Sequence, residues 1–184
     1  MKTNAYTGPS FSRKNRLARV AWGMIWIFLF RPSPRPLHGW RSLLLRAFGA
    51  RIGPRCHIYP SAKIWAPWNL SCAEESCIGD QAIIYNQAPI VLGYRAVISQ
   101  GSHLCTGTHD YESPGFELIA HPITVGPQAW VCAECFVGPG VTLGEGAVIG
   151  ARSVVTKDMP AWMVCAGNPC RPLKPRNIRA PAAK

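Results

Sequence analysis

The stretch from residue 125 to residue 154 can be written as five six-residue units: VGPQAW, VCAECF, VGPGVT, LGEGAV and IGARSV. Each unit begins with an aliphatic residue, and four of the five continue with Gly. The fifth position is mostly compact: Ala129, Cys135, Val141, Ala147 and Ser153. A period of six is neither the period of an α-helix nor the simple alternation of a strand. Such a repeat indicates a stack of similar structural units.

A narrow solenoid with flat sides accounts for this period. One aliphatic side chain per unit points inward, a small residue lies near the corner, and Gly relieves backbone crowding at the turn. Three units complete one triangular coil of about eighteen residues. Successive coils then stack at the ~4.8 Å spacing of neighbouring strands.

The same phase extends toward the N-terminus with two slips. Aliphatic residues recur every six positions at Ile52, Ile58, Ile64 and Leu70, then at Ile78 and Ile84, then at Leu92, Ile98 and Leu104. The steps from 70 to 78 and from 84 to 92 are two residues too long, so we expect bulged corners there. Residues 106–122 interrupt the repeat and are expected to form a protruding loop. The predicted solenoid domain spans residues 51–174.

The segment 1–50 is predicted to be helical, and the basic tail 175–184 to be poorly ordered. The run Val20–Phe30 is apolar throughout and is followed by Pro32. It is too short to span a bilayer, which takes about 20 residues. Two interpretations stay open: a hydrophobic cap or subunit contact, and an interfacial membrane anchor with basic flanks. A second helix is expected from the helical spacing of Trp40, Leu43, Leu44, Ala47 and Phe48.

Charge is distributed unevenly along the 184 residues, whose formal net charge is +11. Residues 1–55 contain eleven Lys or Arg and no acidic residue, whereas residues 56–170 contain four basic residues and all nine acidic ones. The body is therefore mildly acidic and both ends are basic. Without a helix-turn-helix, a zinc finger or an aromatic-basic motif, this pattern does not favour nucleic acid binding.

The eight cysteines are expected to be reduced strand or core residues. The run Val20–Phe30 lacks the small-residue cleavage site of a signal peptide, so an oxidising compartment is not indicated. Cys132 and Cys135 form a lone Cys-x-x-Cys pair, which is not enough for a zinc site. We expect no metal requirement.

Two motifs outside the repeat give the chain a family resemblance. One is Thr106-Gly107-Thr108-His109-Asp110, and the other is the ending Ala166-Gly167-Asn168-Pro169-Cys170-Arg171. Together with the hexads, they resemble the hexapeptide-repeat acetyltransferases. The closest branch is that of the colanic-acid and exopolysaccharide biosynthesis acetyltransferases, indicated by Pro67–Leu70, Tyr85-Asn86, Ile98–Gln100, Leu104–Thr106 and the Trp-containing N-terminal segment. The resemblance implies a left-handed parallel β-helix, a homotrimer with active sites between subunits, and acetyl-CoA as co-substrate.

His109 matches the catalytic histidine of that family. Transfer of an acetyl group to a hydroxyl requires the hydroxyl to lose a proton, and an imidazole is largely neutral at pH 7 and able to accept it. Asp110 either orients the imidazole or caps the loop. Asn86 matches an asparagine that contacts the acceptor or supports the transition state, with a structural corner role as the alternative. Tyr85 and Gln100 are further acceptor-site candidates.

The resemblance also indicates where coenzyme A binds. Trp130 matches a tryptophan beside the pantetheine arm, and the backbone around Ala133 and Ala151 is expected to pair with the pantetheine amides. The phosphates require cations, which we expect from Arg152, Lys157, Arg171 and Lys174.

The resemblance favours direct acetyl transfer to a sugar hydroxyl in exopolysaccharide biosynthesis. The acceptor is expected to be a lipid-linked saccharide at the cytoplasmic face of the membrane, which peripheral association would suit. Nucleotide-sugars, free oligosaccharides and serine are alternative acceptors. A covalent route through Cys105 is less favoured, since its repeat phase makes it a strand residue. A zinc-dependent carbonic anhydrase of similar fold and a non-catalytic β-helical scaffold are the rival functions.

Overall fold

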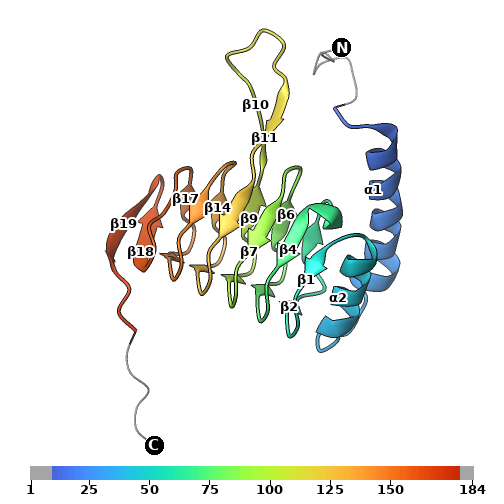
Figure 1. The fold of residues 1–184 in the computed structure, drawn as a ribbon, viewed down its shortest axis with the longest axis horizontal. Coiled ribbons are helices and arrows are strands. Elements are labelled where there is room, and N and C mark those ends of the chain that lie inside the picture. The colour runs from blue at the N-terminus through green and yellow to red at the C-terminus, as the bar shows by residue number, and fades with distance from the viewer. Residues whose placement is uncertain (1–9, 179–184) are drawn as a thin grey trace, which may run out of the picture.

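The hexad residues form the sides of a triangular solenoid in the computed structural model, which describes residues 10–178 (Figure 1). Three mainly parallel sheets, here called A, B and C, make up the three sides. Sheet A contains β1 (Arg51–Ile52), β4 (Leu70–Cys72), β7 (Ile90–Leu92), β12 (Ile123–Val125) and β15 (Thr142–Leu143). Sheet B contains β2 (His57–Ile58), β5 (Cys77–Ile78), β8 (Val97–Ile98), β13 (Trp130–Val131), β16 (Val148–Ile149), β18 (Met163–Gly167) and β19 (Cys170–Pro175). Sheet C contains β3 (Lys63–Ile64), β6 (Ile83–Tyr85), β9 (His103–Cys105), β14 (Phe136–Val137) and β17 (Val154–Val155).

The predicted inward residues form the core of this solenoid. All fifteen hexad aliphatics from Ile52 to Val155 are buried, and Ile52, the most accessible of them, is only 7% exposed. Val125 pairs with Leu143 and Val131 with Ile149, so these coils repeat every eighteen residues. The fold is a left-handed parallel β-helix, which confirms the predicted fold class.

One of the two predicted slips is wrongly located. Ile52 pairs with Cys72, and Cys72 with Leu92, so the first coils contain twenty residues. Cys72 therefore occupies the hexad position that was expected for Leu70, while Leu70 is an additional buried residue after the 3-10 turn η2 (Pro67–Asn69). The first slip lies between Ile64 and Cys72 rather than between residues 70 and 78. Both slips and the insertion 106–122 thus occur at the same corner, between sheets C and A.

Close approach of the coils explains why Gly is needed at one corner. A Cβ on Gly126 would lie 2.7 Å from the backbone nitrogen of Glu145 in the next coil. Real Cβ atoms do not come this close to backbone, so only Gly allows the two coils to pair here.

Helices cover the open N-terminal end of the solenoid. Helix α1 (Arg13–Ile25) continues into a π-helical turn, η1 (Trp26–Phe30), and α2 (His38–Ala47) lies beside them (Figure 1). The Nε1–H of Trp22 donates to the carbonyl of Ile64 at 2.7 Å, and that of Trp26 donates to the carbonyl of Ala62 at 2.9 Å. Within residues 10–178 no earlier coil pairs with these carbonyls, and the side-chain donors take its place. The inner face of the run 20–30 is therefore a hydrophobic cap, one of the two open alternatives.

Arginines on α2 complete this cap. Arg41 is fully buried, and its Nε donates to the carbonyl of Ile58 at 2.5 Å. Arg46 donates from Nε to the carbonyl of Ile52 at 2.9 Å. Burial lowers the pKa of the Arg41 guanidinium. Its remaining donors meet Ser33, Pro34 and Arg35, so the buried charge is surrounded by acceptor oxygens.

The C-terminal end is closed by backbone instead. Strand β19 turns back antiparallel on β18 and becomes the edge of sheet B. The side chain of Arg176 adds to this closure, because its Nη1 donates to the carbonyls of Gln128 and Gly146 at 2.8 and 2.9 Å. The expected tail 175–184 therefore begins with two ordered residues, while residues 179–184 lie outside the described part of the chain.

All eight cysteines carry free thiols. Cys72 and Cys165 occupy inward positions of the coils, and burial raises the pKa of both thiols. Cys132 is half-buried and Cys135 is buried in the coil of β13 and β14, and burial raises the pKa of both thiols.

Candidate active site

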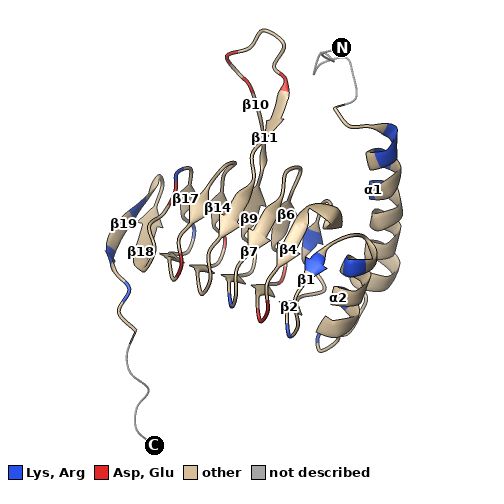
Figure 2. Ribbon diagram, viewed as in Figure 1, with Lys and Arg blue, Asp and Glu red and all other residues tan. Residues whose placement is uncertain are grey.

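The insertion at residues 106–122 is a β-hairpin rather than an irregular loop. Strand β10 (Gly107–His109) pairs antiparallel with β11 (Leu118–Ala120), and the pair stands away from the solenoid (Figure 1). The hairpin leaves the body directly after β9, at the corner between sheets C and A. Three acidic residues occur along it: Asp110, Glu112 and Glu117. The red segments of the hairpin ribbon in Figure 2 mark such residues.

His109 is the last residue of β10 and is half-buried. Its Nδ1 lies 2.9 Å from the backbone carbonyl of Phe116. A carbonyl only accepts hydrogen bonds, so this contact requires a hydrogen on Nδ1 and leaves the lone pair of a neutral ring on Nε2. The Phe116 ring stacks on the imidazole, with centroids 4.5 Å apart and planes 8° apart. The imidazole is thus fixed in orientation and in tautomer by one residue across the hairpin.

Asp110 makes a contact that corresponds to the loop-capping alternative. Its Oδ1 accepts a hydrogen bond from the backbone N–H of Glu112 at 3.2 Å, the pattern of an Asx-turn. Its own backbone N–H donates to the carbonyl of Glu117 at 2.9 Å. The group that holds the Nδ1 of His109 is the Phe116 carbonyl, not this carboxylate.

The structure does not bring Asn86 to the surface where a substrate would bind. Asn86 is fully buried at the corner below the hairpin. Its Oδ1 accepts from the backbone N–H of Ala66 at 2.9 Å, and its Nδ2 donates to the carbonyl of the same residue at 2.7 Å. These contacts are those of the structural corner role, one of the two alternatives that the sequence left open for Asn86.

The two acceptor-binding candidates lie at different corners of the solenoid, one on each side of sheet C. Tyr85 is on the outer face of β6, next to Trp65 and His103, near the base of the hairpin. Gln100 is at the other corner, where it lines a cavity of about 430 Å³ over the outer face of sheet B. The structure does not bring these two side chains together.

Two further features near the hairpin have no signal in the sequence. His103 lies between the rings of Tyr85 and Phe136, and burial lowers its pKa, which favours the neutral ring. Its Nε2 has no hydrogen-bond partner among the described residues.

Phe116 was not expected at all, because only the register of the hairpin places its carbonyl against His109. Cys105 is an outer strand residue, as its repeat phase predicts, and its thiol faces the carbonyl of Gly107.

Trp130 is exposed on the outer face of sheet B. Its side chain is 45% exposed, and its Nε1–H donates to the hydroxyl of Ser99 at 2.8 Å. Ala133 and Ala151 both lie at the corner between sheets B and C, one coil apart. The Ala133 carbonyl accepts a hydrogen bond from the backbone N–H of Arg152 in the next coil at 2.9 Å. This carbonyl is thus already paired within the solenoid.

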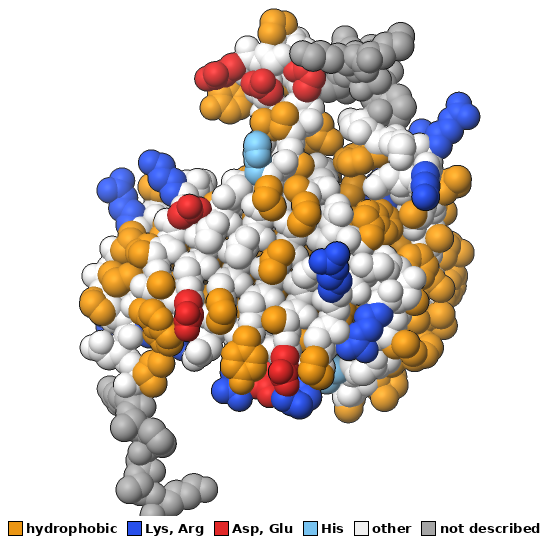
Figure 3. Space-filling view, viewed as in Figure 1, with side chains coloured by type: hydrophobic (Ala, Val, Ile, Leu, Met, Phe, Trp, Pro, Cys, Tyr) orange, Lys and Arg blue, Asp and Glu red, His pale blue; other side chains and the backbone are white. Residues whose placement is uncertain are grey.

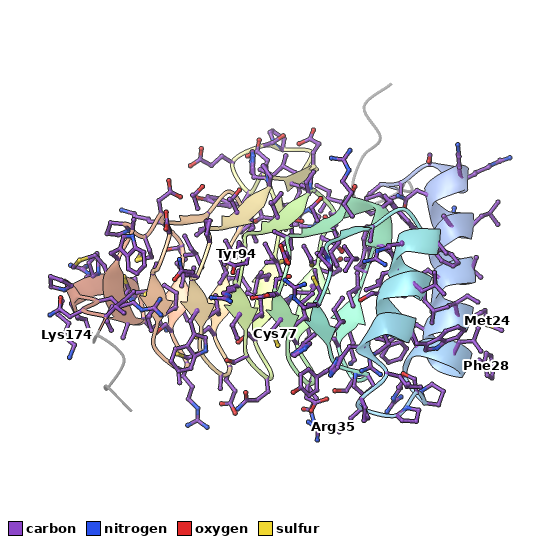
Figure 4. All side chains as sticks on the ribbon, turned by 60° about the horizontal axis from the view of Figure 1, so that its bottom comes forward. Met24, Phe28, Arg35, Cys77, Tyr94 and Lys174 are labelled. Carbon is purple, nitrogen blue, oxygen red and sulfur yellow. The ribbon has the colours of Figure 1, made fainter. Side chains whose placement is uncertain are left out.

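The four cations expected for phosphate binding are distributed around the C-terminal end and do not form one cluster. Arg152 is paired with Glu134 at 2.6 Å in a strongly exposed ion pair. Arg171 pairs with Ala166 toward the corner between sheets B and C, whereas Lys174 pairs with Val164 toward the corner between A and B. Lys157 follows β17 at the third corner. Figure 4 shows Lys174 at the end of the molecule opposite to the helices.

Within residues 10–178, no group of three or more His, Cys, Asp or Glu side chains is placed to hold a metal ion.

The family model and the similar proteins all belong to hexapeptide transferases or acetyltransferases. Residues 122–157 match the family described as bacterial transferase hexapeptide (six repeats). The chain is 43% identical over 166 residues to the putative colanic acid biosynthesis acetyltransferase of Escherichia coli strain K12, covering 90% of this chain and 91% of that protein. It is 30% identical over 143 residues to the galactoside O-acetyltransferase of the same strain, covering 76% and 70%.

Solved structures share the fold at lower identity. A hexapeptide-repeat acetyltransferase from Vibrio cholerae complexed with acetyl-CoA gives a TM-score of 0.82 at 22% identity, covering 92% of this chain and 93% of that one. A galactoside acetyltransferase in complex with coenzyme A gives a TM-score of 0.83 at 24% identity, covering 92% and 86%. These likenesses confirm the fold that the hexads predict.

Proposed function

Because this chain belongs to the hexapeptide-repeat acetyltransferases, we propose that it transfers the acetyl group of acetyl-CoA to a sugar hydroxyl, with His109 as the general base. The observation that carries the proposal is the hydrogen bond from Nδ1 of His109 to the Phe116 carbonyl. It leaves Nε2 as the basic atom, on a hairpin that projects into solvent beside the solenoid.

The chemistry follows from that tautomer. The acceptor hydroxyl attacks the thioester carbonyl carbon while its proton moves to Nε2 of His109. The tetrahedral intermediate then collapses, the C–S bond breaks, and the imidazolium returns the proton to the leaving thiolate. Assistance of this kind contributes ~10²–10⁴ in rate. The stacked Phe116 ring limits rotation of the imidazole through both steps.

Acetyl-CoA is the proposed co-substrate, and no metal enters the reaction. Two proteins of the same fold are known in complex with coenzyme A or acetyl-CoA, which supports this choice. We assign Trp130 to the pantetheine arm, because its ring is exposed on a flat outer face. Backbone at Ala133 and Ala151 remains the proposed pantetheine contact. The phosphates are assigned to Arg152 and Arg171, which share the corner between sheets B and C, whereas Lys157 and Lys174 at the other corners would contribute only from a neighbouring subunit.

A homotrimer is part of the proposal because one chain does not complete this site. His109 rises from the corner between sheets C and A, whereas Trp130 lies on sheet B, the side opposite to that corner. A neighbouring copy packed side by side would supply the missing face. Sedimentation analysis of the active protein is expected to give the trimer mass, and full specific activity in a monomer would contradict this arrangement.

The acceptor is proposed to be a lipid-linked saccharide of exopolysaccharide biosynthesis at the cytoplasmic face of the membrane. The 43% identity to the putative colanic acid biosynthesis acetyltransferase supports this class. Tyr85 is the proposed acceptor contact, since it lies near the hairpin base. Gln100 would contribute only from a neighbouring subunit.

The test is thiol release from acetyl-CoA across a panel of acceptors: lipid-linked sugars, free oligosaccharides, nucleotide-sugars and serine. We expect release with a sugar acceptor and a loss of about 10²–10⁴-fold in His109→Ala. His121→Ala is the matched control, because His121 is exposed at the base of the same hairpin and should keep its activity. No release with any acceptor, together with no acetyl-CoA binding, would favour a non-catalytic scaffold.

A further inference from the structure

The outer face of the N-terminal helices carries an apolar stripe that the fold does not use. Its members lie on one face of α1 and η1, three or four residues apart except for the adjacent pair at its end, and are between 52% and 70% exposed: Leu17, Val20, Met24, Ile27 and Phe28. The opposite face of the same helices, with Trp22 and Phe30, is buried against the first coil. The helices are therefore apolar on two faces: one face packs against the core, and the other is exposed to solvent.

The stripe points away from the body of the protein. Met24 and Phe28 lie on the far side of the helices from the coils in Figure 4, at the end of the solenoid. Hydrophobic side chains gather over this helical end in Figure 3. The exposed indole of Trp40 on α2 is tied to η1 by a hydrogen bond from Nε1 to the Leu29 carbonyl at 3.0 Å. The apolar area thus extends over both helices and forms the N-terminal end of the solenoid.

Positive charge frames the stripe. Arg13 and Arg31 are exposed beyond its two ends, and Lys14 and Arg16 are exposed on the first turns of α1 (Figure 2). Residues 1–55 contain no Asp or Glu, so no carboxylate on this segment would repel an anionic partner. Within residues 10–178 no helix is long and apolar enough to cross a bilayer. An apolar face with basic flanks and interfacial Trp suits a helix that lies in a headgroup region.

We propose that this stripe docks the protein onto an anionic phospholipid bilayer, with α1 and η1 parallel to the membrane plane. A second copy of the chain is the less suitable occupant. Its cationic flanks would face the cations of the first, and side-by-side packing of solenoids leaves their ends uncovered. In a trimer, all three stripes would face the same way and bind one surface together.

This inference rests on the proposed membrane-face location, but it can fail separately from acetyl transfer. Transfer to a soluble sugar is measured without vesicles, and vesicle binding is measured without substrate. No thiol release with any acceptor would contradict the proposed function alone. Absence of vesicle binding would contradict the docking surface alone.

The experiment is flotation of the full chain with vesicles of phosphatidylcholine containing phosphatidylglycerol, compared with phosphatidylcholine alone. We expect binding to the anionic vesicles that weakens as salt rises. The double variant Met24→Glu/Phe28→Glu should lose at least about tenfold in bound fraction, since two carboxylates would enter the interface. Both side chains are exposed, so the variant should keep its melting temperature and its transfer to soluble acceptors.

Ile178→Glu is the matched control, an apolar-to-acidic change at a residue 65% exposed near the other end of the chain. It should bind vesicles like the native protein. The proposal is overturned if the native protein does not bind anionic vesicles, or if the double variant binds as well as Ile178→Glu. It is also overturned if, without vesicles, the native protein forms larger assemblies that the double variant does not, since a second copy would then cover the stripe.

Discussion

Leu104 and His109 are five residues apart and illustrate two different environments. Leu104 in β9 is fully buried and pairs with Ile84 on one side and Val137 on the other. His109 in β10 is half-buried and pairs only with Leu118 in a two-stranded hairpin. Residues of the solenoid are constrained from both neighbouring coils, whereas those of the hairpin are constrained mainly by each other. The hairpin can therefore vary for chemistry without disturbing the core.

Truncation should separate the two regions most clearly in stability. Ile98→Ala, at a fully buried coil position, should lower the free energy of unfolding by about 2–5 kcal/mol, because it leaves a cavity between coils. Tyr111→Ala on the hairpin, where the side chain is 80% exposed, should change it by less than about 0.5 kcal/mol. Urea denaturation measures both. Similar losses in the two variants would show that the hairpin is part of the cooperative core.

Asn86 tests where the boundary between the two regions lies. Asn86→Ala should cost about 1–3 kcal/mol in unfolding free energy, because the N–H and carbonyl of Ala66 lose their buried partners. Gln100→Ala, at an exposed corner residue, is the control and should be nearly neutral. If Asn86→Ala instead kept its stability and lost only acetyl transfer, a substrate contact would be the better assignment.

Phe116 tests whether the hairpin itself orients the base. Phe116→Ala keeps the backbone carbonyl but removes the stacked ring, a contact worth about 0.5–1.5 kcal/mol. We expect kcat to fall by up to roughly tenfold, with the melting temperature lowered by no more than about 6 °C. An unaltered kcat would mean that the carbonyl alone is sufficient to hold the imidazole.

The smallest effect is expected at the exposed corner of the coils. Glu75 accepts hydrogen bonds from Arg95 at 2.5 Å and Arg55 at 3.0 Å, and these lower the pKa of its carboxyl. A lowered pKa contributes stability above the unfolded value, and that stability is lost as pH falls through the folded value. Glu75→Gln should therefore lower the melting temperature slightly at pH 7. Thermal melts at acid pH should show no difference, and a difference that persists there would contradict the ion-pair explanation.

Much of the solenoid was predictable, because each hexad carries its own signal. The inward aliphatics from Ile52 to Val155 and the place of His109 outside the repeat required no knowledge of distant residues. The position of the first slip was not predictable in the same way. Leu70 and Cys72 are both apolar and both buried, so their order of use depends on pairing with Ile90 and Leu92 in the next coil.

The candidate site was only partly predictable for the same reason. His109 and the loop that carries it were identified, but the roles of Asp110 and Asn86 were left open by the sequence. Asn86 finds its partner in Ala66, twenty residues away. The four expected cations are close in sequence to the chain end, yet the coils direct them to different corners.

By itself, the sequence determined the triangular β-helix and its buried aliphatic rows, because a six-residue period acts locally and repeats. His109 became the candidate base through the family resemblance of the loop that interrupts the repeat. Only the tertiary structure decided which contacts complete the molecule. The Trp22 and Arg41 donors on the first coil, the Phe116 carbonyl on His109 and the burial of Asn86 all join residues that local patterns do not relate. Such contacts depend on how whole elements pack. A buried polar group must form a hydrogen bond, and its partner can come from a distant part of the chain.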